Sequence, residues 1–296
     1  GYNLYFRETD YGEFNVANYL TNSNGLGLQF GYPISDITRL NFNLTYDKTD
    51  IDIGTLPARE IYDFVAAEGN VFETLSLGFT WQRVTLNRGL FPTDGSSTSF
   101  TLTSTIPGSD INYYRANIRQ RFYQPLSSQL VFGFQGELGY LDAYGETDET
   151  PFFQNFYAGG PRSLRGFESN TLGPRSTNAP CYEFNYDDGT CPNLIDTDGD
   201  GELDSPYYNP YATTNEYSSR SRYRDPPIGG NIKIEGSLQL IFRLPFIEDQ
   251  RSLRSAFFFD FGNVFSDNCK EYQFNCYKPS IDDLRYSYGV GVTWIT

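Results

Sequence analysis

The stretch RLNFNLTYD, residues 39–47, decides the fold class, because apolar and polar side chains alternate along it without interruption. Leu40, Phe42, Leu44 and Tyr46 occupy every second position, and polar residues fill the positions between them. Successive side chains of a β-strand point to opposite faces, so a period of two places these four residues on one face. The stretch is therefore predicted to be a strand with one apolar and one polar face.

Nine further segments of the chain show the same alternation. They are residues 2–7, 25–32, 75–82, 99–106, 115–122, 130–140, 232–240, 255–264 and 284–294. Together the ten segments predict an all-β, antiparallel chain of about ten strands, an even number as in bacterial outer-membrane barrels. Nothing in the sequence requires a helix or a second domain, so residues 1–296 are interpreted as a single domain.

Two architectures can use such strands. A soluble sandwich buries the apolar faces between two sheets, whereas a membrane barrel turns them toward lipid around a wet lumen. Large aromatic residues stand near the strand ends, as in the aromatic girdles of membrane proteins. These residues are Tyr32, Tyr46, Trp81, Tyr140 and Trp294. They favour an up-and-down transmembrane β-barrel, whose edges near residues 2–7 and 284–296 should pair with each other or with another copy.

The composition limits the possible functions. A formal net charge of -15 argues against a nucleic-acid partner, which would need a basic patch. The sequence contains no histidine, which removes Ser-His-Asp catalysis and histidine-ligated metal sites. The protein is therefore interpreted as non-enzymatic.

The four cysteines form two local pairs, Cys181 with Cys191 and Cys269 with Cys276, each in a polar segment. Neither pair has the CxxC spacing of a zinc or redox site. Two local disulfides in an oxidising compartment are therefore predicted.

A long extracellular or lumenal loop, residues 142–229, interrupts the predicted barrel, and loops of this length are usually functional or disordered. It contains YAGGPRSLRGFESN, residues 157–170. This stretch could cradle a phosphate, lie on the surface or fold back into the lumen. It matches neither the GxxxxGKS/T nor the GxGxxG pattern, which makes a phosphate-binding loop a poor interpretation.

A resemblance to a known family rests mainly on this loop, in the stretch PFFQNFYAGGPRSLRGFESNTLGPR, residues 151–175. The stretch closely resembles a loop of the BamA outer-membrane assembly factor family that carries an Arg-Gly-Phe motif inside the barrel. In this sequence the motif is Arg165, Gly166 and Phe167. Other parts of the chain that resemble the family are residues 87–97, 254–265 and 289–296.

The resemblance covers essentially the whole chain and implies a C-terminal barrel fragment. By the same resemblance, the fragment lacks the POTRA domains and, of the family's roughly sixteen strands, the first few and the last two. The implied function is to fold and insert β-barrel clients into the bacterial outer membrane. The implied partners are outer-membrane lipid, unfolded β-barrel clients and assembly lipoproteins, with no nucleic acid. The alternative is a polypeptide-secretion pore or passive channel of the same superfamily, since lumenal Arg115, Arg119 and Arg121 could favour anions.

Inside a barrel Arg165 needs an anionic partner, because an unpaired and partly desolvated guanidinium costs several kcal/mol. Asp260 and Glu235 both fall on the inward-facing side of their predicted strands. The resemblance places Asp260 on a family carboxylate that holds the motif arginine, whereas the other family carboxylate aligns with Gln239. Arg165 in solvent, with only screened neighbours, is the simpler alternative.

The glycines of the loop have expected roles of their own. Gly166 lets the backbone turn tightly beside Arg165, and Phe167 can wedge against the barrel wall. The adjacent Gly159 and Gly160 are assigned to the same lumenal motif.

The second part of the loop holds IDTDGDGELDS, residues 195–205, which resembles the first nine positions of an EF-type calcium loop. The predicted ligands are Asp196, Asp198, Asp200, Asp204 and the Glu202 carbonyl. Position twelve, normally a bidentate glutamate, is Tyr207. The alternatives are therefore a weak calcium site and a solvated acidic loop, and no other cofactor is expected.

Overall fold

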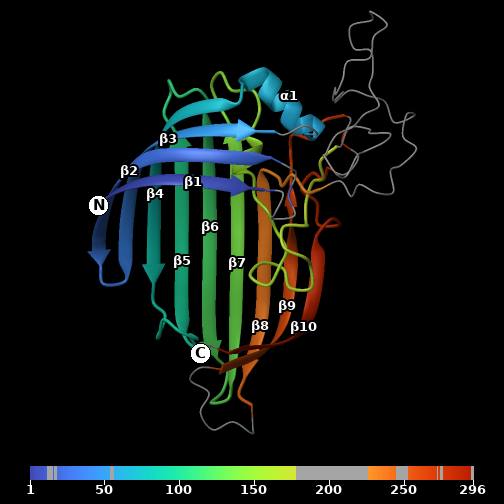
Figure 1. Cartoon of the computed structure of the whole chain (residues 1–296). Coiled ribbons are helices and arrows are strands. Elements are labelled where there is room, and N and C mark those ends of the chain that lie inside the picture. Colours follow the sequence, from blue (N-terminus) through green and yellow to red (C-terminus); the bar gives the residue numbers. More distant parts are fainter. Residues whose placement is uncertain are drawn as a thin grey trace, which may run out of the picture.

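The computed structural model of the chain describes residues 1–11, 16, 19–53, 57–177, 226–244, 253–271, 273 and 276–294. Ten strands form one sheet in which each strand pairs antiparallel with its neighbours in chain order (Figure 1). They are β1 (Tyr2–Asp10), β2 (Leu20–Ser35), β3 (Thr38–Asp52), β4 (Val71–Val84), β5 (Gly95–Thr105), β6 (Tyr113–Pro125), β7 (Leu130–Ala143), β8 (Ile232–Phe242), β9 (Leu253–Phe265) and β10 (Arg285–Trp294). The prediction of an all-β, antiparallel, up-and-down fold with ten strands is confirmed.

The apolar faces of neighbouring strands lie in register. Phe42 of β3 pairs with Phe30 of β2 and with Phe79 of β4, and the rings of Phe42 and Phe79 lie 5.4 Å apart. These side chains remain open to the surroundings, with 63% of Phe30 and 45% of Phe42 exposed. A sandwich would bury this face, so the open apolar face supports a membrane barrel.

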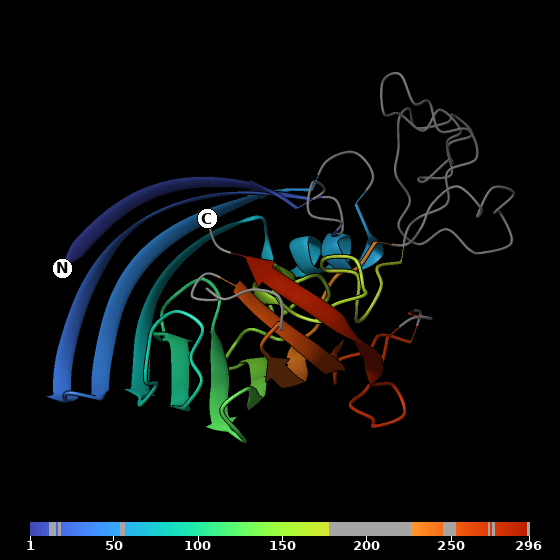
Figure 2. The same ribbon diagram turned by 90° about the horizontal axis from the view of Figure 1, so that it is seen from below.

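The sheet curls around a hollow, as the view along its strands shows (Figure 2). β1 and β10 are the two edges, and within the described ranges no hydrogen-bonded ladder joins them. Of the two expected arrangements, pairing of these edges with each other is therefore not seen in the described residues, and pairing with another copy stays a prediction. Each edge strand pairs on one side only, β1 with β2 and β10 with β9.

A helix, α1 (Arg59–Glu68), lies across one end of the sheet (Figure 1). No helix was expected from the sequence, but Ile61 and Phe64 are three positions apart and are both buried on the inner side of α1. The Phe64 ring meets those of Phe72 and Phe152 at 6.0 and 5.3 Å, within an apolar cluster that closes this end of the hollow. Among the described residues, no helix has the length and apolar character needed to cross a membrane.

Candidate functional site

The loop that follows β7 turns back inside the curve of the sheet, where it lies near β8 and β9 (Figures 1 and 2). The Phe156 amide donates to the Gly230 carbonyl at 2.8 Å, and the Gly230 amide returns a bond to the Phe156 carbonyl at 3.1 Å. The Leu172 amide then donates to the Ala158 carbonyl at 3.2 Å. This bond closes residues 158–172 into a compact segment, here called the lumen lobe.

Left-handed glycines give the lumen lobe its shape. The φ angle is 108° at Gly159, 96° at Gly160 and 87° at Gly166, a region that residues with a side chain rarely adopt. A Cβ atom at Gly159 would lie 2.4 Å from the Glu168 carbonyl oxygen. The Gly160 amide meanwhile donates to the Leu164 carbonyl at 3.1 Å. The turn before Arg165 therefore requires glycine at both adjacent positions.

Arg165 of the lumen lobe donates three hydrogen bonds to Asp260 of β9. Its Nε donates to Oδ2 at 2.7 Å, its Nη2 donates to Oδ1 at 2.6 Å, and its backbone amide donates to Oδ2 at 3.1 Å. Asp260 has no exposed surface, whereas 26% of the Arg165 side chain is exposed. A carboxylate buried this completely needs both donors and a compensating charge, and the bidentate guanidinium supplies both.

Two further side chains of the sheet hold the guanidinium. Its Cζ lies 3.7 Å from the centroid of the Phe258 ring, and its Nη2 donates to Ser237 Oγ at 2.8 Å. The Gln239 amide reaches this network through the same Ser237 oxygen, to which its Nε2 donates at 3.3 Å. Neither Phe258 nor Ser237 was among the partners predicted for Arg165. The alternation of side chains along a strand places both on the inner face with Asp260, because Phe258 is two residues from Asp260 and Ser237 pairs with Asp260 across β8 and β9.

Glu235 lies on the same inner face but binds another part of the lumen lobe. Its carboxylate accepts a hydrogen bond from the Ser163 hydroxyl and pairs with Lys233 Nζ at 3.1 Å. Lys233 Nζ also lies 3.6 Å from a carboxylate oxygen of Glu137. The expected contact between Glu235 and Arg165 does not appear among the contacts of the described residues. Glu235 instead holds the lobe two residues before the motif arginine.

The residues around Arg165 have different surroundings. Gly166 is exposed beside β10, where an added Cβ would lie 3.4 Å from the Ser287 Cβ. Phe167 is half-buried and packs against the apolar cluster, and Leu164 is fully buried within it. The burial of Leu164 could not be predicted, because a single leucine in a polar loop has no periodicity to reveal which side is buried.

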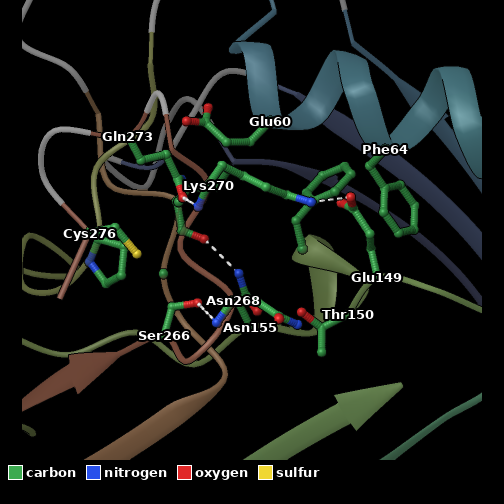
Figure 3. A pocket seen from close by; sticks show the side chains of 14 residues that line it. Glu60, Phe64, Glu149, Thr150, Asn155, Ser266, Asn268, Lys270, Gln273 and Cys276 are labelled. Atoms are coloured by element: carbon green, nitrogen blue, oxygen red, sulfur yellow. Dashed lines mark hydrogen bonds and ion pairs between the residues drawn. The ribbon is translucent and has the colours of Figure 1, made fainter. Parts of the chain in front are cut away.

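Thr177, the last residue described before the gap in the long loop, is bound to α1. The Thr177 amide donates to both carboxylate oxygens of Glu60, at 3.0 and 2.9 Å, and the Arg59 amide donates to the Thr177 carbonyl at 2.9 Å. Burial raises the pKa of Glu60, and the bonds from Thr177 act against that rise. Glu60 also borders a pocket in which Lys270 pairs with Glu149 (Figure 3). These contacts join α1, the long loop and the loop before β10.

One of the remaining predicted sites lies among the residues that the structure describes, and the others lie outside them. Cys269 and Cys276 form the predicted disulfide, with their Cα atoms 5.6 Å apart. Several residues lie outside the described ones: Cys181, Cys191 and the predicted calcium ligands Asp196, Asp198, Asp200, Glu202 and Asp204. In the described part of the chain, no cluster of acidic or cysteine side chains is arranged to hold a metal ion.

Comparison with known proteins places this geometry in a family. The profile of the Omp85 superfamily domain matches residues 1–296. The chain is 29% identical over 322 residues to the outer membrane protein assembly factor BamA of Neisseria meningitidis serogroup B, covering 100% of this chain and 35% of that protein. It is 25% identical over 177 residues to the SAM50-like protein CG7639 of Drosophila melanogaster, covering 59% of this chain and 39% of that protein.

A solved structure shares the architecture. The crystal structure of BamA from Haemophilus ducreyi lacking POTRA domains 1–3 superimposes with a TM-score of 0.74 at 25% sequence identity. The superposition covers 99% of this chain and 52% of the crystallised one. The chain therefore spans about a third to a half of the length of these relatives.

Proposed function

Because the chain belongs to the Omp85 superfamily, we propose that it is the barrel part of a machine that folds and inserts β-barrel proteins into the outer membrane. The similarity to BamA and to a SAM50-like protein supports this assignment. The proposed work is not enzymatic, since it consists of strand pairing and transfer into lipid. Its proposed partners are outer-membrane lipid, unfolded β-barrel clients and assembly lipoproteins.

The observation that carries the proposal is the lumen lobe bound to the inner wall by Arg165 and Asp260. The outer face of the same wall is apolar and suits lipid, with 52% of Phe257 and 40% of Phe259 exposed. Bound in this way, the lobe braces β8 and β9 from inside while their outer faces meet the membrane. A braced wall gives an incoming client strand a fixed sheet against which to pair.

The test measures client assembly after the lobe has been released. The intact protein is reconstituted into liposomes and given a urea-unfolded outer-membrane barrel, whose folding is followed by its shift in gel mobility. Arg165→Ala and Asp260→Asn should each slow assembly. The double variant should be no slower than the slower single variant, because both changes remove the same contact. Arg162→Ala is the matched control, since Arg162 is an exposed arginine of the same lobe.

Normal assembly by both variants, with their lobes shown to be released, would contradict the proposed function. Ion conductance that persists after deletion of residues 142–229, without any assembly defect in cells, would favour a passive channel instead.

A further inference from the structure

Arg254 is the second residue of β9, six residues before Asp260 on the same strand. An even spacing along a strand keeps side chains on one face, so Arg254 belongs to the inner face that holds the lumen lobe. Its Nε and Nη2 atoms have essentially no exposed surface. Among the residues that the structure describes, neither atom has a hydrogen-bond partner.

Arg165 shows what this edge of a guanidinium binds in the same hollow. Its Nε and Nη2 hold the two carboxylate oxygens of Asp260 at 2.7 and 2.6 Å. Arg254 presents the same pair of donors without an acceptor, and a buried donor left unpaired destabilises the protein. A planar group with two oxygens would satisfy both donors at once.

The two rings beside Arg254 differ in how firmly they are held. Its Cζ lies 4.8 Å from the centroid of the Tyr123 ring and 6.0 Å from that of Phe91. Tyr123 is buried, and the Gln135 Nε2 donates to its hydroxyl at 3.1 Å. Phe91 is half-buried in the turn between β4 and β5 and has a φ angle of 47°. Such a backbone is strained in a residue other than glycine, and strain of this kind gathers at functional sites.

The turn that carries Phe91 is braced at its base. The Asn87 Oδ1 accepts hydrogen bonds from the amides of Thr93 and Asp94 at 3.2 and 3.3 Å, and its Nδ2 donates to Thr93 Oγ1 at 2.9 Å. The base can therefore stay closed while the Phe91 ring changes position. Arg121, two residues from Tyr123 on the inner face of β6, is exposed, so solvent screens its charge and it is not counted in the site.

We propose that Arg254, Tyr123 and Phe91 form a carboxylate-binding site inside the hollow that takes an acidic side chain of an extended polypeptide. Tyr123 is the fixed wall of the site, and Phe91 is a strained cover that moves aside when the carboxylate binds. The site lies on the inner face rather than on the apolar outer face, which favours a polypeptide over a lipid headgroup. The inference rests on the fold and does not depend on the proposed assembly function.

The test is a calorimetric titration of the intact, folded protein in neutral detergent, with a peptide of alternating alanine and glutamate as the probe. Arg254→Gln should weaken binding at least about tenfold, the equivalent of losing one charge-assisted hydrogen bond. Phe91→Gly should instead tighten binding, because it removes the ring that must move aside before a carboxylate can reach Arg254. The matched control is Arg121→Gln, which changes the same net charge on the same face and should stay within about threefold.

Three results would overturn the proposal: equal affinity of the wild type and Arg254→Gln, no peptide binding by the wild type, or binding of inorganic phosphate without binding of the peptide. If Arg254→Gln does not fold, nuclear magnetic resonance of arginine-labelled wild-type protein decides. The Arg254 Nε–H signal should shift when the peptide is added, and a signal that stays in place would likewise refute the site.

Discussion

Replacing Arg165 with alanine removes the charged anchor of the lumen lobe and leaves its partner behind. Asp260 loses the donors at 2.7 and 2.6 Å and keeps only the backbone amide at 3.1 Å. Because Asp260 has no exposed surface, water cannot replace the lost donors unless the lobe moves away. The lobe should therefore detach from β9 while the ten-stranded sheet persists.

The size of the effect follows from the burial of the pair. Removing one partner of a buried ion pair typically costs about 3–5 kcal/mol. Arg165 is 26% exposed, so the lower end of that range applies. A loss of about 3 kcal/mol corresponds to a rise of roughly a hundredfold in the population of the detached lobe.

Hydrogen–deuterium exchange measured by mass spectrometry reports this population directly. The amides of Phe156 and Leu172 are bonded to Gly230 and Ala158 within the anchored loop, so peptides containing them should exchange roughly a hundredfold faster. Peptides from the paired strands β3 and β4 should exchange as in the wild type. In Arg165→Lys the loop peptides should exchange at a rate between those of the wild type and of Arg165→Ala. Lysine keeps the charge but not the bidentate geometry or the stacking on Phe258.

Wild-type exchange across residues 156–172 in Arg165→Ala would refute the reasoning, because it would mean that the lobe is held without its arginine. An equal acceleration in Arg162→Ala, which changes an exposed arginine nearby, would refute it as well.

Three other perturbations have defined outcomes. Gly160→Ala forces a Cβ to within 2.5 Å of Ser169 Oγ at a φ of 96°, so it should destabilise the lobe by at least about 1 kcal/mol and speed its exchange. Burial raises the pKa of Glu60 above 4.5, so the stability that the protonated carboxyl contributes is present below that pH and is lost as the pH rises through the raised pKa. Over that rise the unfolding midpoint of the wild type should fall relative to that of Glu60→Gln, and parallel midpoints would contradict this. Replacing Cys269 and Cys276 with serine should cost about 2.5 kcal/mol through the short closed loop, seen as faster proteolysis within residues 266–283 with β9 and β10 still paired.

Much of the sheet could be predicted because its signal is local. Phe42 and its neighbours alternate with polar residues, and a strand can satisfy that pattern only by facing two environments. The helix α1 could not be found in this way. Its buried apolar side chains, Ile61 and Phe64, make one short stripe in a polar loop, and tertiary packing stabilises the helix more than propensity does.

The site was predictable only in part for a related reason. The alternation of side chains along the strand and the family resemblance predicted Asp260 as a partner of Arg165, and Arg165 contacts it. Which loop atom reaches which strand residue depends on the path of the lobe, and that path is set by glycine geometry and by the burial of Leu164. Glu235 illustrates the limit, because it faces inward as expected yet binds Ser163.

The central claim is that the apolar face of the sheet meets lipid while its polar face lines the hollow. Spin labels placed singly at residues 41, 42, 43 and 44 of β3, with the protein in liposomes, test it most directly. Positions 42 and 44 should be relaxed by oxygen dissolved in the bilayer, and positions 41 and 43 by a water-soluble nickel complex. The reverse pattern, or no alternation at all, would contradict the claim.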